Sequence, residues 1–271
     1  MMEALQASEG RVDLWYTYQD LAIDSRLLET YAGLLSEDES VRWRRFLFER
    51  DRRRFLIARA MLRDVVSRYV GCEPCSLAFE YNPYGKPALA SPPGQSIRFN
   101  LSHSAGLAVC AVTRGHDVGV DVESPERRTD VLGLARRFFA ESEVAALGRR
   151  PPEEQRRTFF EYWTLKEAYI KACGRGLSIP LDAFGFTLRA DRPPTIGFAA
   201  GMADDPGDWQ FAQVFLGQDY PIALALRSCR EEEMTVGIRR IIPLQRAGDA
   251  AVLPCNGLRR WTLESEFPEL S

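Results

Sequence analysis

Residues 159–171 read FFEYWTLKEAYIK, a run in which good helix formers predominate. Two prolines, Pro151 and Pro152, stand upstream, where a helix can begin. Gly174 follows the run, where a helix can end in a left-handed residue. The stretch therefore predicts a long helix, around which the neighbouring segments can be placed.

One face of this predicted helix carries both a residue suited to the core and residues suited to catalysis or binding. Trp163, Glu167 and Lys171 recur every four residues, so an aromatic ring, a carboxylate and an ammonium lie on successive turns of one face. On its own, a Glu-Lys pair at this spacing stabilises an exposed helix by only about 0.2–0.5 kcal/mol. A catalytic interpretation therefore needs a second cluster of polar residues elsewhere in the chain.

Length and composition favour a globular protein with a sizeable core. The chain has 271 residues, of which 45% are hydrophobic, and a chain of this size tends to divide into two lobes. Its net charge of −3 argues against a broad nucleic-acid surface. No apolar run approaches the ~20 residues of a membrane span, and the first 20 residues do not resemble a signal peptide. We expect a cytoplasmic protein with reduced cysteines, since its six cysteines are scattered.

The N-terminal half combines a strand with an arginine-rich helical region. Residues 12–18 alternate as a strand does, and residues 36–39 (SEDE) have the form of a helix capping box. Residues 42–68 carry ten arginines and apolar residues at helical spacing. Such arginines usually form a solvated face. The alternative is that Arg42 and its neighbours bind a phosphate group, for which a guanidinium is well shaped.

Two turns follow, and each presents a basic residue. Residues 82–85 (NPYG) predict a turn that places Lys86 at the tip of a loop. Residues 97–104 and 107–112 predict a hairpin around Ser102, His103 and Ser104. Lys86 could be simply solvated and His103 simply bonded to backbone, and the local pattern leaves both alternatives open.

The second polar cluster is the strand at residues 117–123. Asp121 and Glu123 share one face of it, because strand side chains alternate with period two. Two carboxylates on an apolar strand repel each other and lose solvation, so a cation is expected between them. Mg²⁺ held by a few carboxylates and substrate phosphates fits best, with Glu167 available as a third ligand.

The remaining chain repeats the order of a long helix followed by strands. Residues 130–148 predict a helical region whose buried positions are Phe138, Phe139, Val144 and Leu147. Beyond the helix at 159–171, strands are predicted at 184–188, 209–215 and 222–227. We therefore expect two similar lobes joined near residues 113–118. Residues 245–271 give no clear signal.

Four segments in order resemble the motifs of the 4'-phosphopantetheinyl transferases, in particular the Sfp type. They are Gly85-Lys-Pro87, Phe99-Asn-Leu-Ser-His-Ser104, Gly119-Val-Asp-Val-Glu123 and Trp163-Thr-Leu-Lys-Glu-Ala-Tyr-Ile-Lys171. The resemblance covers roughly residues 12–240. The length favours the two-lobed monomeric branch over the short trimeric carrier-protein synthases.

The resemblance implies an α+β fold of two similar α+β lobes, related by a pseudo-twofold, with the active site at the lobe interface. An N-terminal lobe is expected at residues 1–115, a C-terminal lobe with the metal-binding strand and the long helix at 116–244, and a tail at 245–271. The implied activity moves the phosphopantetheine arm of coenzyme A to a serine of an apo acyl or peptidyl carrier protein. Adenosine 3',5'-bisphosphate is released in this Mg²⁺-dependent reaction.

Residue roles follow from the same matching of motifs. Glu167 is the candidate base, directly or through a water, and Lys171 steadies or protonates the leaving phosphate. The chain departs from the Sfp pattern at Glu39 and Phe55, near the expected 3'-phosphate contact, and Arg54 is the candidate replacement. The resemblance assigns Mg²⁺ to Asp121, Glu123 and Glu167, and coenzyme A contacts to Arg42, Arg54, Gly85, Lys86, Asn100, Ser102, His103, Asp121 and Lys171.

Two other functions use similar residues. A metal-dependent phosphoesterase could employ three carboxylates and a lysine, but it would hydrolyse a phosphodiester without a carrier protein. A non-catalytic nucleotide-binding module would keep the pocket while losing a metal carboxylate. The sequence predicts neither nucleic-acid nor membrane binding, and it does not identify which carrier is served.

Overall fold

The computed structural model describes residues 5, 10–19, 24–93, 96–104, 106–124, 126, 129–217, 220–228, 234–245, 251–254 and 261–263, the last two ranges as backbone. The helices are α1 (Ser25–Leu34), α2 (Glu37–Arg44), α3 (Glu49–Val70), α4 (Val131–Phe138), α5 (Glu141–Gly148) and α6 (Pro152–Cys173). The strands of the first half are β1 (Arg11–Tyr18), β2 (Ala78–Tyr81), β3 (Pro87–Ser91), β4 (Ile97–Ser104), β5 (Leu107–Arg114) and β6 (Val118–Val122). Those of the second half are β7 (Phe184–Arg189), β8 (Arg192–Phe198), β9 (Trp209–Leu216), β10 (Tyr220–Arg227), β11 (Thr235–Arg240), β12 (Ala251–Pro254) and β13 (Trp261–Leu263). The mixture confirms the α+β class.

Two sheets form the centre of the molecule. One has the strand order β12-β11-β1-β5-β4 and the other β13-β9-β10-β6. Apolar side chains from both sheets make one shared core, in which Val12 and Val109 of the first meet Val120, Val214 and their neighbours of the second. The short ribbons β2-β3 and β7-β8 stand apart from these two sheets. The two halves of the chain therefore share one central core, in addition to the cluster that each half buries under its own long helix.

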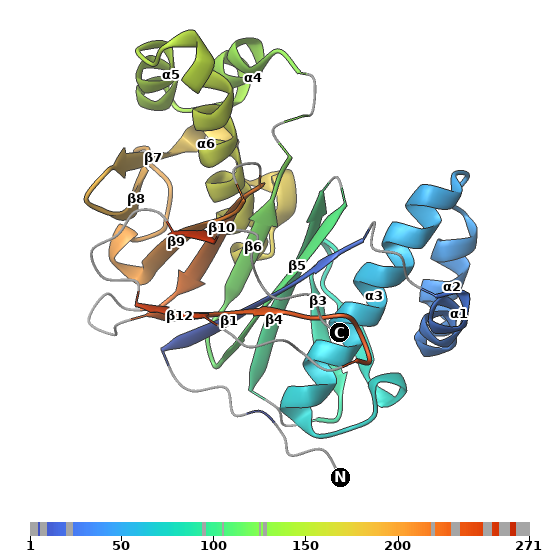
Figure 1. The fold of residues 1–271 in the computed structure, drawn as a ribbon. Coiled ribbons are helices and arrows are strands. Elements are labelled where there is room, and N and C mark those ends of the chain that lie inside the picture. The colour runs from blue at the N-terminus through green and yellow to red at the C-terminus, as the bar shows by residue number, and fades with distance from the viewer. Residues whose placement is uncertain are drawn as a thin grey trace.

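A long helix covers each sheet (Figure 1). The apolar side of α3 packs through residues such as Met61 and Val65 onto the first sheet. The apolar side of α6 packs in the same way, through Leu165 and Tyr169, onto the second sheet. Each helix has 22 residues and ends at a glycine with positive φ, Gly71 at 70° and Gly174 at 66°.

The helix predicted from residues 159–171 is confirmed. It begins at Pro152, where proline occupies the first turn, and ends at Cys173 before the left-handed Gly174. The capping box at Ser36 and Glu39 is also present, with both reciprocal hydrogen bonds formed. The predicted hairpin matches β4 and β5, and the later strands match β7, β9 and β10.

Two helical regions differ from the prediction because each is broken. The arginine-rich region is interrupted at residues 45–48, between α2 and α3. There the Phe46 ring turns inward against Phe55, with ring centroids 5.3 Å apart. Residues 130–148 form α4 and α5, separated at Phe139 and Ala140, where the Glu143 carboxylate accepts the Ala140 N–H and caps α5. Phe139 and Leu147 are buried as expected, whereas Phe138 and Val144 are half-buried.

The end of the described chain returns to the first sheet. β11 runs parallel to β1, pairing Thr235 with Arg11 through to Arg240 with Tyr16, although residues 235–240 lie in the range expected for the second lobe. β12 extends that sheet and β13 extends the other, so part of the tail takes part in both. None of the helices in the described ranges combines the length and apolar character that a membrane crossing needs.

Candidate active site

The site begins where strand β6 lies directly against helix α6. A Cβ atom added to Gly119 would lie 2.0 Å from the carbonyl oxygen of Ala168 and 2.5 Å from the amide nitrogen of Ala172. Only a glycine allows the two backbones to approach this closely. The approach places Asp121, two residues further along β6, beside the face of α6 that carries Lys171.

Three polar side chains from three elements meet at this point. The ammonium of Lys171 on α6 lies 2.6 Å from Asp121 Oδ1 on β6 and donates to Ser102 Oγ on β4 at 2.9 Å. Ser102 Oγ in turn donates to Asp121 Oδ1 at 2.9 Å. The Asp121 side chain is 7% exposed and that of Lys171 27% exposed, so the carboxylate is buried while the ammonium remains partly accessible to solvent. The two sheets thus contribute to one cluster, which brings together Ser102, Asp121 and Lys171, three of the candidate site residues from the sequence.

The other two predicted carboxylates, those of Glu123 and Glu167, lie near this cluster. Glu123 Oε2 accepts a hydrogen bond of 2.9 Å from Ser104 Oγ. Burial raises the pKa of the Glu167 carboxyl, and the charges of Asp121 and Glu123 raise it further, against an opposing effect of Lys171. The Glu167 carboxyl is therefore close enough to Asp121, Glu123 and Lys171 for their charges to act on it.

The donor set fits a hard divalent cation. Asp121 Oδ2 is buried and has no hydrogen-bond donor among the residues that the structure describes. An unsatisfied buried carboxylate oxygen is costly, and it is the kind of ligand that Mg²⁺ takes. Within the described ranges, however, no three His, Cys, Asp or Glu side chains are grouped closely enough to form a ready-made metal cage. A cation here would have to complete its shell with water or substrate oxygens, which is usual for Mg²⁺.

Strand β4 supplies the next two predicted residues. The Asn100 side chain is buried, and its Oδ1 accepts the Val120 N–H of β6 at 3.0 Å, so it ties the two sheets together. His103, near the end of β4, has its pKa lowered by partial burial and by the positive charges of Lys171, Arg42 and Arg54. His103 therefore lies where the cations of both halves of the molecule act on one ring.

Arg42 belongs to a basic cavity of about 540 Å³ beside α2 and α3. Glu39, a departure from the Sfp pattern, is buried there and pairs with Arg59 and with Arg63, the latter at 2.8 Å. These guanidinium groups lower the pKa of the Glu39 carboxyl despite its burial. Phe55, the other departure, packs under Arg42, whose guanidinium carbon lies 5.6 Å from the ring centroid. The cavity is lined by Ser36, Asp38, Glu39, Arg42, Phe55, Arg59, Arg63, Leu77, Ala78, Phe79 and Tyr81.

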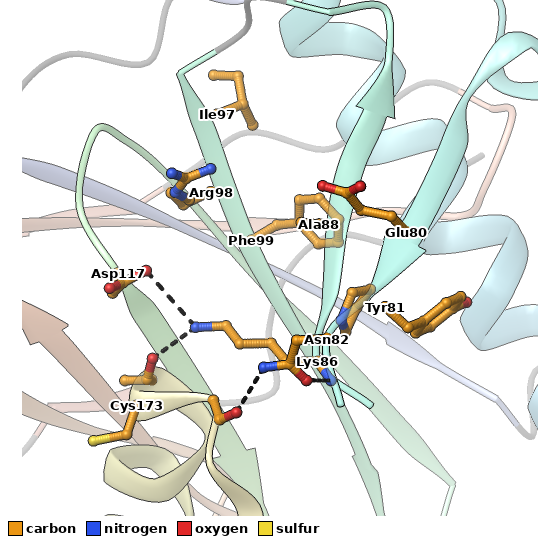
Figure 2. Close-up of a pocket in the computed structure, with 13 residues that line it drawn as sticks. Glu80, Tyr81, Asn82, Lys86, Ala88, Ile97, Arg98, Phe99, Asp117 and Cys173 are labelled. Atoms are coloured by element: carbon orange, nitrogen blue, oxygen red, sulfur yellow. Dashed lines mark hydrogen bonds and ion pairs between the residues drawn. The ribbon is translucent and has the colours of Figure 1, made fainter. Parts of the chain in front are cut away.

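The loop between β2 and β3 holds the far end of α6. Figure 2 shows Lys86 reaching to the end of the helix, where its ammonium donates to the Ala172 carbonyl at 2.7 Å. Asn82 Nδ2 donates to the Gly174 carbonyl at 2.6 Å, while Asn82 Oδ1 accepts the Lys86 N–H. Gly85 turns the loop with a φ of 85°. We call these contacts from Asn82 and Lys86 to the end of α6 the carbonyl clasp.

The sequence predicts Lys86 at the tip of a loop, whereas in the structure its ammonium contacts the end of α6. Burial lowers the pKa of its ammonium, and Asp117 Oδ1, 4.0 Å away, is its acidic neighbour. The ammonium is thus engaged by protein groups beside a cavity of about 400 Å³. Lys86 and Gly85 remain candidates for contacts with coenzyme A.

Comparisons with known proteins cover most of the chain. A family model described as the 4'-phosphopantetheinyl transferase superfamily matches residues 117–225, and one described as 4'-phosphopantetheinyl transferase, N-terminal, matches residues 24–114. The chain is 32% identical over 178 residues to a 4'-phosphopantetheinyl transferase of Bacillus subtilis, a match that covers 66% of this chain and 77% of that protein. The chain belongs to the 4'-phosphopantetheinyl transferase family.

Individual members of the family match to different extents. The chain is 43% identical to 4'-phosphopantetheinyl transferase HetI of a Nostoc species over 152 residues, 56% of this chain and 64% of HetI. It is 32% identical to 4'-phosphopantetheinyl transferase Sfp of Bacillus subtilis strain 168, over 64% of this chain and 75% of Sfp. The chain spans slightly less than two thirds of the length of HetI and of a Synechocystis relative, which is covered to 63%.

Within this 4'-phosphopantetheinyl transferase fold, the sequence interpretation missed three contributions. Ser104 holds Glu123, and Gly119 allows β6 to approach α6. Lys166, inside the helix motif, is fully buried and pairs with Glu143 at 2.7 Å, while also donating to the carbonyls of Leu181 and Phe184. Spacing alone could have indicated Ser104, since it shares a strand face with Ser102. The other two depend on long-range packing.

Proposed function

We propose that this protein transfers the 4'-phosphopantetheine arm of coenzyme A to a serine of an apo carrier protein and releases adenosine 3',5'-bisphosphate. Family membership supports this proposal. The observation that carries it is the convergence of Lys171, Asp121 and Ser102 from α6, β6 and β4. That cluster provides both a cation and buried carboxylate oxygens, as a reaction at a pyrophosphate requires.

The arrangement in space is part of the proposal. Two lobes related by a pseudo-twofold are supported by the pairing of one 22-residue helix with each sheet. We propose lobes at residues 1–115 and 116–244 with the active site between them, and with 235–240 crossing back to pair with β1. We retain as proposals the monomeric state and the cytoplasmic location expected from the sequence.

In the proposed reaction the carrier serine oxygen forms a bond to the β-phosphorus of coenzyme A while the bond from that phosphorus to the bridging pyrophosphate oxygen breaks. Glu167, directly or through a water, takes the serine proton. Lys171 holds the departing phosphate by its ammonium, where negative charge increases in the transition state. The electron pair of the broken bond remains on adenosine 3',5'-bisphosphate.

Residues of both lobes would hold the substrate. Asp121, Glu123 and Glu167 would ligate Mg²⁺, which when bound supplies charge neutralisation at the pyrophosphate. Ser102 and His103 would contact phosphate, and Arg42 and Arg54 would supply positive charge for the 3'-phosphate. Lys86 would border the same region through the carbonyl clasp, with Gly85 beside it in the loop. Asn100 would border it where its side chain joins β4 to β6.

Mass measurement of carrier proteins tests this function. The protein is incubated with coenzyme A, Mg²⁺ and a panel of apo acyl and peptidyl carriers, and each carrier is then weighed. We expect a gain of one phosphopantetheine arm on at least one carrier, and none on the same carrier with its serine replaced by alanine. Cleavage of coenzyme A without a carrier would instead indicate a phosphoesterase. Binding of coenzyme A with no transfer to any carrier would indicate a non-catalytic module.

A further inference from the structure

Lys171 lies on the last turn of α6, and that turn is held from outside the helix. The final carbonyl groups of a helix have no partner within it, so the last turn frays unless other groups bind them. The Ile170 carbonyl accepts the Gly174 N–H at 3.0 Å. The Ala172 carbonyl is bound instead by the ammonium of Lys86, at 2.7 Å. The residue directly after Lys171 is therefore fixed by a side chain from the loop between β2 and β3.

The loop that supplies Lys86 is shaped by its own hydrogen bonds. Asn82 Oδ1 accepts the N–H groups of Tyr84 and Lys86, at 3.0 and 2.9 Å. The Gly85 N–H donates to the Asn82 carbonyl at 2.9 Å. Through Nδ2, the same Asn82 side chain donates to the Gly174 carbonyl. Because the loop is already ordered, it holds the helix end without a large further loss of conformational entropy.

Gly174 allows the loop and the helix end to pack this closely. Its φ is 66°, and a Cβ atom added there would lie 2.8 Å from Lys86 Cδ and 3.1 Å from Asn82 Nδ2. No side chain fits between the loop and the end of α6. Packing of the Lys86 stem thus supports the hydrogen bond that its ammonium makes to the helix.

Lys86 also connects the two elements that meet at the candidate active site. Figure 2 shows its ammonium between Asp117 and the end of α6. Asp117 Oδ1 lies 4.0 Å from that ammonium, and the residue directly precedes β6, which carries Asp121. Lys86 therefore links the start of β6 to the end of α6. The ion pair of Asp121 with Lys171 links the same two elements.

We propose that Lys86 and Asn82 are positioning residues for the transfer reaction, and that Lys86 acts through α6 instead of binding coenzyme A. By holding the last turn of the helix, they keep the Lys171 ammonium against Asp121 and Ser102. The inference rests on the proposed function. It replaces the coenzyme A contact that the family resemblance assigns to Lys86, because the helix end already engages the ammonium.

The kinetics of Lys86→Met test this inference. Methionine is similar in length and lacks the three N–H donors of the ammonium. We expect kcat for carrier modification to fall about 10-fold or more, while the KM for coenzyme A stays within about 2-fold of the wild-type value. Lys86→Arg keeps a donor at the helix end and should recover part of kcat. A rise in the KM for coenzyme A with unchanged kcat would indicate a direct substrate contact and overturn the inference.

The matched control removes a neighbouring cation that is not part of the carbonyl clasp. Arg98 on β4 is exposed and lines the same cavity of about 400 Å³ as Lys86. Arg98→Met makes the same charge change and should keep the wild-type kcat and both KM values. Equal losses of kcat in Lys86→Met and Arg98→Met would assign the effect to the charge of the cavity and contradict positioning.

A second variant acts on the other half of the clasp. Asn82→Asp keeps an oxygen that can accept the Tyr84 and Lys86 N–H groups, and it removes the donor to the Gly174 carbonyl. We expect kcat to fall, again with the KM for coenzyme A within about 2-fold of wild type. A wild-type kcat in this variant would remove Asn82 from the positioning role.

A double-mutant cycle tests whether Lys86 acts through Lys171. In the Lys171→Met background, Lys86→Met should lower kcat by less than about 2-fold, since the group that it positions is already absent. Losses that multiply would show two independent contributions and contradict the inference.

Hydrogen exchange gives a readout that does not depend on activity. In the full chain without coenzyme A or carrier, the Gly174 amide should exchange faster in Lys86→Met than in the wild type or Arg98→Met, because the last turn opens more often. Unchanged exchange would show that the clasp does not hold the helix end. A wild type that modifies no carrier would overturn the proposed function. An active wild type whose kcat survives Lys86→Met would overturn the positioning role alone.

Discussion

At the scale of single residues, Lys171 separates a structural from a catalytic interpretation of α6. The sequence alone allows a weak exposed pair with Glu167, but the ammonium contacts Asp121 and Ser102 on two other strands. A pair that joins three elements can still be only structural, because a partly buried ion pair also fixes geometry. Kinetic measurements can distinguish these two interpretations.

We predict that Lys171→Met lowers kcat for carrier modification by roughly 10²-fold or more, because its charge is needed most in the transition state. Coenzyme A affinity should weaken less than kcat falls. Lys171→Arg keeps the charge and serves as the control, with partial activity expected. A Met variant with near-wild-type kcat would remove Lys171 from the mechanism.

His103 should control part of the pH dependence of stability. Its pKa is lowered below the ordinary value of about 6.5 by partial burial and neighbouring cations. Between the two values the unfolded chain binds more protons than the folded chain, so the free energy of unfolding falls as pH decreases below about 6.5. We predict that His103→Gln removes this component from melting curves recorded without metal or coenzyme A.

The chain has two histidines, so ring signals in NMR spectra can be assigned by comparison with His103→Gln. Adding adenosine 3',5'-bisphosphate should raise the pKa of His103 if its ring meets a phosphate, because an anion favours the charged imidazolium. An unchanged titration in the presence of saturating nucleotide would exclude His103 from the phosphate contacts.

At the scale of elements, the contact between β6 and α6 positions the site. The two backbones meet at Gly119, and they lie so close together that there is no room for even a methyl group on this residue. This glycine is needed for close approach, since the atoms that a Cβ would meet belong to backbone and cannot rotate away.

We predict that Gly119→Ala lowers the free energy of unfolding by several kcal/mol, as overpacking against backbone does, or prevents folding. The control is Gly33→Ala in α1, where an added Cβ meets nothing within 4 Å. That substitution should be neutral or stabilising by up to about 1 kcal/mol, since alanine favours helix. Chemical denaturation of both variants provides the comparison. Equal stabilities would contradict the proposed close approach.

At the scale of the whole molecule, the two halves depend on each other. The central core contains side chains from both sheets, and β11 from the second half pairs with β1 from the first. We predict that residues 1–115 expressed alone do not fold cooperatively, because the fragment exposes the inner face of its sheet and lacks β11. The measurement is a thermal melt followed by circular dichroism, with the full chain as the control. A sigmoidal melt of the isolated fragment would show that it is an independent domain.

Much of this fold follows from local patterns in the sequence. The α6 helix, the capping box of α2, the β4-β5 hairpin and the carboxylate strand are all predictable from periodicity and turn chemistry. The breaks between α2 and α3 and between α4 and α5 are not, because they depend on tertiary packing: Phe46 packs on Phe55 of the next helix, and the buried Glu143 also bonds Phe186 and Lys166. The parallel pairing of β11 with β1 joins residues more than 200 positions apart and has no local signal.

The candidate site divides in a similar way. Asp121 and Lys171 are indicated by strand and helix spacing and Ser102 by the family resemblance, and the structure brings the three together. The departure at Glu39 could not be interpreted from the sequence, since its neutralisation by Arg59 and Arg63 is a tertiary contact. Lys86 was expected at a loop tip with coenzyme A, and its contact with the Ala172 carbonyl could not be predicted from spacing.

The carbonyl clasp has a consequence for insertions and deletions. Asn82 and Lys86 bind the main-chain oxygens of Gly174 and Ala172. These contacts depend on where the helix ends and not on which side chains it carries there. One residue inserted between Lys171 and the clasp would turn the helix by about 100° relative to its end. If the clasp held its oxygens, Lys171 would rotate away from Asp121. The number of residues from Lys171 to Gly174 is therefore constrained more strongly than the identities of the residues between them, and length changes at this end of α6 should be tolerated less than substitutions.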